Sequence, residues 1–141
     1  MAILGIQFSS LYILWFTGCS TKVAETTNNI KLINNTSEQH NITEFKKVIE
    51  INPESEWSHY NLGLVHYNQG EYQQAIQQFE KVIEINPNNI EVHNNLGLAY
   101  HNQGEYSQAV TEFKKVIRIN PTNTEAQNNL GLAYHNQGKY S

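Results

Sequence analysis

Histidine is the side chain in this sequence best suited to metal binding or acid–base chemistry. The chain has 141 residues and 6 histidines, and 34 residues separate His59 from His93 and His101 from His135. Equivalent side chains on neighbouring packed helices lie about 10 Å apart, whereas zinc needs its ligands at about 2.0–2.1 Å. One ion therefore cannot be shared by either pair. A catalytic site is usually unique, and the sequence holds no phosphate-binding glycine loop, HExxH or GxSxG motif. We expect no catalysis, no metal and no cofactor.

Composition excludes further classes of function. The chain carries 9 Lys+Arg against 13 Asp+Glu, for a formal net charge of −4. This balance argues against a nucleic-acid binder, because such proteins need a basic surface to displace counterions. The single cysteine excludes an internal disulfide and a multi-cysteine metal site. An apolar content of 39% is too high for a fully disordered protein.

A period of 34 residues organises most of the chain. Its three prolines, Pro53, Pro87 and Pro121, follow this spacing, and six of its eight glycines recur at two positions of the period. Two longer segments also recur, one without change and one with two differences. They are 94–104 and 128–138 (NNLGLAYHNQG in both), and 42–53 and 110–121 (ITEFKKVIEINP and VTEFKKVIRINP). Internal duplication, rather than chance, produced this chain.

Within each period the apolar residues have helical spacing. In one period, Leu96, Ala99 and Tyr100 follow an i, i+3, i+4 pattern, and Ala109 and Phe113 begin a second stripe of the same kind. The intervening Asn-Gln-Gly predicts a helix end at a glycine that tolerates positive φ. The Asn-Pro sequence predicts the end of the second helix, because the residue before proline avoids the α region. Each unit is thus a helical hairpin that must stack on others to bury its stripes, which predicts an all-α fold.

These positions resemble the tetratricopeptide repeat family. The resemblance covers residues 38–141 and implies an α-solenoid of stacked antiparallel helical hairpins, with two complete units and a half unit at each end. His66 and Asn41 depart from the pattern at positions where other units carry tyrosine and alanine. The residues that carry the resemblance are Leu96, Gly97, Tyr100, Gly104, Tyr106, Ala109, Phe113 and Pro121.

The predicted array over residues 38–141 divides unevenly into units. Complete units are expected at 56–89 and 90–123. The partial unit at 38–55 supplies only a second helix, and the partial unit at 124–141 supplies only a first helix. The last helix then leaves part of its apolar stripe uncovered. Either the array continues in a longer protein, or another surface covers this face, for which head-to-tail stacking of a second copy is one candidate.

Residues 1–19 form a separate hydrophobic segment that ends in Thr-Gly-Cys. This resembles a bacterial lipoprotein signal peptide, which implies that Cys19 is lipidated and that residues 20–37 are a polar linker to the membrane. The expected location is then the bacterial cell envelope, with a lipid-anchored or secreted protein. An uncleaved membrane anchor and a start codon placed too far upstream are the alternatives, and the second would make the protein cytoplasmic.

Asparagines recur on the first helix of each unit. Asn61, Asn95 and Asn129 directly precede the Leu-Gly pairs, so they are expected to form a ladder on the concave face of a solenoid. A side-chain amide both donates and accepts, and so can pair with a peptide backbone. Similar ladders occur in the repeat domain of O-GlcNAc transferases, although duplication alone also explains a repeated asparagine. By this resemblance the further groove positions are Trp57, Tyr60, Leu64, Tyr67, Asn68, Asn94, Leu98, His101, Asn102, Asn128, Leu132, His135 and Asn136.

The groove positions lack the basic residues of the carboxylate clamp found in chaperone-binding members of the family. The expected partner is therefore a protein or extended peptide that is neutral to weakly basic. The sequence indicates a non-catalytic binding scaffold, in its sharpest form a membrane-tethered assembly factor of the cell envelope. The alternatives are a detached regulatory segment of a larger enzyme, such as one resembling O-GlcNAc transferase, or a gene fragment.

Overall fold

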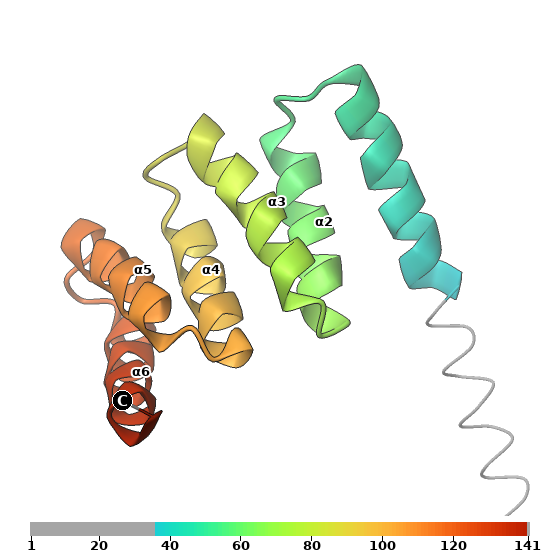
Figure 1. Ribbon diagram of the computed structural model, residues 1–141. Helices are drawn as coiled ribbons and strands as arrows, with labels where there is room; N and C mark the ends of the chain where they lie inside the picture. Colours follow the sequence, from blue (N-terminus) through green and yellow to red (C-terminus); the bar gives the residue numbers. More distant parts are fainter. Residues whose placement is uncertain (1–35, 141) are drawn as a thin grey trace, which may run out of the picture. The chain divides into compact units, whose positions relative to one another are not determined.

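The computed structural model describes residues 36–140, and each regular element among them is an α-helix (Figure 1). Residues 36–51 are helical, and residues 36 and 37 thus lie in a helix rather than in the predicted linker, a difference of the size usual at helix boundaries. Residues 1–35, which include the predicted anchor segment 1–19 and Cys19, lie outside the described residues. The remaining helices are α2 (Glu56–Asn68), α3 (Tyr72–Ile85), α4 (Ile90–Gln103), α5 (Tyr106–Ile119) and α6 (Thr124–Tyr140).

Helices α2 to α6 belong to one compact unit and pack in the order of the chain. Helix α2 packs against α3 and α4 packs against α5, each pair forming an antiparallel hairpin, and α3 and α5 pack in turn against α4 and α6 (Figure 1). The predicted fold, an all-α stack of helical hairpins with half units at its ends, is confirmed.

Glycines reverse the chain between the two helices of each complete hairpin. Gly104 ends α4 with a φ of 87°, and Gly70 follows α2 with a φ of 77°. A residue with a Cβ rarely adopts this left-handed conformation. The sequence also predicts such an end at Gly138, and this prediction is wrong, because α6 continues through Gly138 to Tyr140. No second helix folds back onto α6 within the described residues, so nothing there requires the reversal.

A phenylalanine seated against a glycine joins the two helices of each complete hairpin. Phe79 and Phe113 are fully buried, and a Cβ added to Gly63 or Gly97 would lie 2.6 Å from the facing ring. The helices approach this closely only because the glycine offers no side chain. This contact and the buried apolar residues around it form the core.

The repeated histidines His59 and His93 are buried and join the same hairpins. His93 Nδ1 lies 2.7 Å from Glu112 Oε2 on α5, and its Nε2 lies 2.9 Å from the carbonyl oxygen of Pro87. In the preceding hairpin, His59 Nδ1 lies 2.9 Å from Gln78 Oε1. These imidazoles therefore satisfy buried polar groups and tie helices together.

Candidate functional site

The first helices of successive units are linked side by side by polar side chains. Tyr60 on α2 donates its hydroxyl to Glu91 Oε1 on α4 at 2.5 Å, and Asn95 Nδ2 on α4 donates to the same hydroxyl at 3.2 Å. One unit further along, Asn94 Nδ2 donates to Glu125 Oε1 on α6 at 2.8 Å, and Asn129 Nδ2 donates to Asn94 Oδ1 at 3.5 Å. The same pair of contacts thus repeats with the period of the sequence.

A second row of contacts repeats two helical turns further along these helices. Asn102 donates to the hydroxyl of Tyr67 at 2.8 Å, and Asn136 Nδ2 lies 2.8 Å from His101 Nε2. We call the two rows together the polar lacing; its members are Tyr60, Glu91, Asn95, Asn94, Glu125, Asn129, Tyr67, Asn102, His101 and Asn136. It fixes α2, α4 and α6 in register with one another.

Each asparagine of the predicted ladder has a hydrogen-bond partner in its own chain. Asn95 and Asn129 donate to the preceding first helix, whereas Asn61 donates to the carbonyl oxygen of Trp57 on its own helix, at 2.7 Å. These contacts were not predicted from the sequence, although Tyr, Glu and Asn at spacings of 31 and 35 residues were a readable signal. Each amide has two N–H donors and an acceptor oxygen, so each keeps capacity for a second partner.

The remaining predicted groove residues differ in exposure. Leu64 and Leu98 pack against the hydrophobic core, whereas Leu132 on α6 is 50% exposed. The exposed polar positions are Asn68, Asn102, Asn128 and His135. The face therefore offers polar groups along its length, with accessible apolar surface at its two ends, at Trp57 and Leu132.

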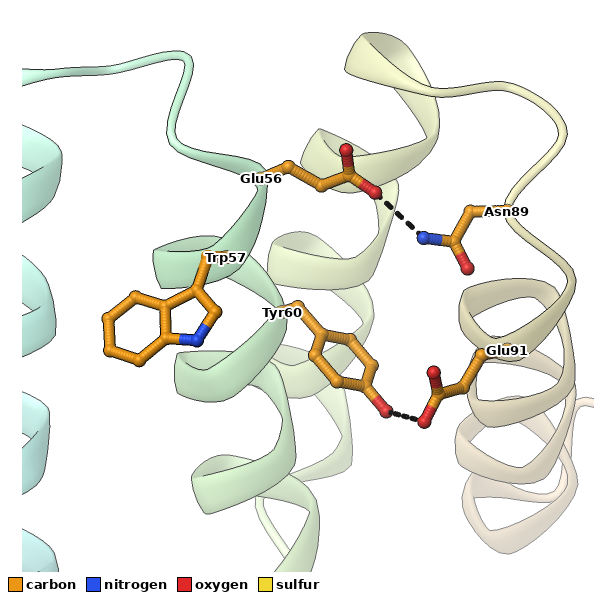
Figure 2. Close-up of a pocket in the computed structure, with 5 residues that line it drawn as sticks. All are labelled: Glu56, Trp57, Tyr60, Asn89 and Glu91. Atoms are coloured by element: carbon orange, nitrogen blue, oxygen red, sulfur yellow. Dashed lines mark hydrogen bonds between the residues drawn. The ribbon is translucent and has the colours of Figure 1, made fainter.

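A pocket of about 340 Å³ lies where α2 meets the start of α4. Figure 2 shows two hydrogen bonds that cross it, Tyr60 to Glu91 and Asn89 to Glu56, and the indole of Trp57, which points away from both of them. Trp57 is 62% exposed and packs edge-on against Phe45, with ring centroids 5.3 Å apart. The pocket therefore combines two carboxylates with two aromatic rings. Trp57 and Tyr60 were predicted groove residues, whereas Glu56 and Asn89 were not.

The electrostatics of the pocket keep Tyr60 protonated. Burial of its ring, together with the hydrogen bond to Glu91 and the negative charge of that carboxylate, raises the pKa of Tyr60 from 10.0 to about 12. Burial likewise raises the pKa of Tyr67. Both hydroxyls thus remain hydrogen-bond donors at any physiological pH.

Basic side chains gather on a different helix. Lys114, Lys115 and Arg118 line a hollow of about 310 Å³ on α5 together with Thr111. Lys115 pairs with Glu112 at 2.7 Å, and the Lys114 ammonium lies 5.4 Å from the centre of the Tyr134 ring. Two of the three cations thus have partners within the fold, and we assign this cluster no ligand. Among residues 36–140 no three His, Cys, Asp or Glu side chains are grouped to hold a metal ion.

Known proteins share the helical hairpins and their period. The TPR repeat family matches residues 42–70, 66–104 and 99–138, which together span more than half of the chain. The chain belongs to the TPR repeat family. No curated protein matches it in sequence.

Solved structures of TPR proteins resemble this one. A crystal structure of MamA protein is 31% identical, with a TM-score of 0.66, over 69% of this chain and 53% of that chain. A second crystal structure of MamA gives the same identity and TM-score and is covered to 57%. The first TPR of Spaghetti (RPAP3), bound to the HSP90 peptide SRMEEVD, is 16% identical, with a TM-score of 0.69, over 77% of this chain and 86% of that chain. The last resemblance is one of fold alone.

The chain spans little more than half the length of the MamA chains it matches. Of the described helices, none combines the length and the apolar character that crossing a bilayer requires. The TPR repeats support a protein-interaction scaffold as the general function.

Proposed function

We propose that this TPR protein is a non-catalytic scaffold that binds an extended peptide along the face formed by α2, α4 and α6. The observation that carries the proposal is the pocket at Trp57 at one end of that face. Its open indole has no counterpart in the later units, where the equivalent residues are Glu91 and Glu125. A large exposed tryptophan beside two carboxylates is typical of a binding site rather than of a solvated surface.

The pocket favours a basic side chain of the partner. A lysine or arginine over the Trp57 indole would gain a cation–π contact, and the negative charges of Glu56 and Glu91 on the same pocket would attract it. The net charge of −4 attracts such a peptide over a longer range. An acidic peptide like the SRMEEVD segment in the RPAP3 structure would place its carboxylates against Glu56 and Glu91, and we do not expect it to bind.

The rest of the peptide would lie along the polar lacing. The free N–H groups and carbonyl oxygens of Asn95, Asn102 and Asn136 offer donors and acceptors to a peptide backbone. Because the lacing already holds these amides in place, binding would cost little side-chain entropy. Rigid, partly satisfied amides suit a ligand that is read through its backbone, with its sequence preference concentrated at Trp57.

The binding test uses fluorescent extended peptides that differ only in a central residue, which is Arg, Lys, Ser or Glu. Anisotropy should rank the Arg and Lys peptides above Ser, and Ser above Glu. Trp57→Ala should weaken the Arg peptide about tenfold, because it removes the cation–π partner and its burial. Glu91→Gln, which keeps an acceptor for Tyr60, should lower the preference for Arg over Ser about two- to fivefold.

The matched control is Gln77→Ala on α3, which removes an exposed neutral side chain from a helix outside the proposed face. It should leave all four affinities unchanged. A preference for the Glu peptide, or equal effects of the Trp57 and Gln77 variants, would contradict the proposal.

We further propose that the scaffold is tethered in the bacterial cell envelope through Cys19. The support is the sequence alone, a hydrophobic segment over residues 1–19 that ends at the single cysteine. Expression in a bacterium should yield a lipid-bearing mature chain in the membrane fraction, and Cys19→Ala should abolish the lipid mass. An unmodified chain would favour the cytoplasmic alternative. An in-frame catalytic domain encoded beside these repeats would favour the regulatory segment of a larger enzyme.

A further inference from the structure

The outer face of α6 has the features of a docking face without its partner. On α4 the equivalent face is covered by α5, so that His93 is 2% exposed and Gly97 is buried. On α6 the equivalent residues Gln127 and Gly131 are both exposed. A Cβ added to Gly97 would lie 2.6 Å from Phe113, whereas one added to Gly131 would meet nothing within 4 Å in the described part of the chain. We call a glycine that makes room for a buried phenylalanine ring a phenylalanine socket. The socket at Gly131 is empty in the described part of the chain.

The helix of residues 36–51 carries the complementary face, and no other helix within residues 36–140 packs over it. Its residues Asn41, Glu44 and Val48 occupy the positions of Ala109, Glu112 and Val116 on α5. Those α5 residues are all buried, with Val116 at 0% exposed, whereas Asn41, Glu44 and Val48 are exposed, Val48 to 37%. Phe45 stands at the position of Phe113 and is only half-buried.

The two uncovered faces are sequence copies of a pair that packs within this molecule. Residues 128–138 of α6 are identical to residues 94–104 of α4, and residues 42–53 differ from 110–121 of α5 at only two positions. The α4–α5 hairpin therefore shows how the two faces fit together. We propose that α6 of one chain binds the helix of residues 36–51 of a second copy, with Phe45 seated on Gly131.

The polar groups at this junction also match. In the complete hairpins, a hydrogen bond joins His93 to Glu112 and His59 to Gln78. The equivalent residues at the junction are Gln127 of one copy and Glu44 of the second, and the Gln127 amide would donate to the Glu44 carboxylate. Asn41 makes the junction less favourable. It stands at the position of Ala75 and Ala109, which are fully buried, so docking would bury its polar amide. The association is therefore weaker than the packing within a hairpin, and Asn41→Ala should strengthen it.

The contact is heterologous, because each chain offers a different face to each neighbour. The chain of residues 1–141 should accordingly form species larger than a dimer as its concentration rises, in sedimentation equilibrium under reducing conditions. Gly131→Leu fills the socket and should leave a monomer. Gly138→Leu, a matched change at another open glycine of α6, should associate like the unaltered chain. Asn41→Ala should lower the dissociation constant about three- to tenfold.

A mixing experiment separates specific docking from general stickiness. Val48→Lys blocks the helix of residues 36–51, and Gly131→Leu blocks α6, so each variant alone should be monomeric. Their mixture should form a heterodimer that grows no further, because each contributes its one open face. A monomeric unaltered chain, association that survives Gly131→Leu, or no heterodimer in the mixture would each overturn the proposal. Because Trp57 packs against Phe45, the peptide affinities are measured on the Gly131→Leu variant, whose monomeric state keeps that face open, so the failure of one proposal is read separately from the failure of the other.

Discussion

At the scale of single residues, glycine decides how closely two helices approach. Gly63 and Gly97 each admit a buried phenylalanine at a distance that no side chain would allow. Gly131 has the same place in its helix and the same neighbours in sequence, but faces open space. Glycine is therefore required at Gly63 and Gly97, whereas the fold of the single chain does not need a glycine at Gly131.

We predict that Gly97→Ala lowers the free energy of unfolding by about 1–2 kcal/mol. Overpacking a core costs ~1–3 kcal/mol, and alanine returns ~0.5–1 kcal/mol over glycine inside a helix. Gly131→Ala, measured in dilute solution, should instead raise the stability by ~0.5–1 kcal/mol, because only the helix term remains. Urea denaturation followed by circular dichroism gives both values. Equal effects of the two changes would contradict the claim that the fold needs a residue without a side chain at Gly97.

Tyr60 provides a prediction about pH. Its raised pKa of about 12 means that the folded protein keeps the phenolic proton while the unfolded chain loses it near pH 10.0. The contribution of Tyr60 to stability is thus complete below pH 10.0 and is lost as the pH rises toward 12. Burial and the charge of Glu80 raise the pKa of Tyr100 as well, so part of the alkaline loss belongs to that residue.

The check compares the chain with Tyr60→Phe in urea denaturation between pH 9 and the alkaline limit of folding. The variant should be less stable at neutral pH, because Glu91 and Asn95 lose their partner. Above pH 10.0 its stability should fall less steeply than that of the unaltered protein. Parallel alkaline slopes would show that the Tyr60 proton is not held by the fold.

At the scale of helices, an identical sequence takes two conformations. Residues 94–104 and 128–138 are the same, yet Gly104 is left-handed and ends α4, whereas Gly138 lies inside α6. The difference comes from the next helix along the chain, since α5 packs back on α4 and forces the chain to turn. Local sequence therefore predicts that a helix can stop at this glycine, and tertiary packing decides whether it does.

This contrast predicts opposite effects of one substitution. Gly104→Ala should destabilise the protein by about 1–2 kcal/mol, because alanine is strained at positive φ. Gly138→Ala should stabilise it by ~0.5–1 kcal/mol, because the glycine is in a helix. Thermal unfolding of the two variants provides the comparison, and a destabilised Gly138→Ala would mean that this glycine also turns in solution.

Periodicity made the hairpins predictable, and the same periodicity concealed details of the candidate site. The spacing of Leu96, Ala99 and Phe113 was enough to predict stacked helices, because burial of apolar stripes determines that fold. The partners of Asn61 and Asn95 were not predictable from their shared position. Asn95 reaches Tyr60 on the preceding first helix, whereas Asn61 turns to the carbonyl oxygen of Trp57 on its own helix.

At the scale of the whole molecule, the residues that hold the array together differ from those proposed to bind a partner. Phenylalanine sockets and buried histidines hold the hairpins together, and the polar lacing holds α2, α4 and α6 in register. Most of these groups have counterparts at the same position of another repeat unit. The exposed indole of Trp57, which lines a pocket with Glu56 and Glu91, is the main break in the repetition on this face, and the proposed function places the specificity there.

The most direct test locates a bound peptide on the molecule. Heteronuclear NMR of the side-chain N–H groups, during titration with the Arg peptide, should shift the Trp57 indole and the amides of Asn95 and Asn102 at saturable concentrations. Resonances on the outer surfaces of α3 and α5 should stay in place. Shifts confined to those outer surfaces, or a Trp57 indole that does not respond to a peptide that binds, would contradict the account.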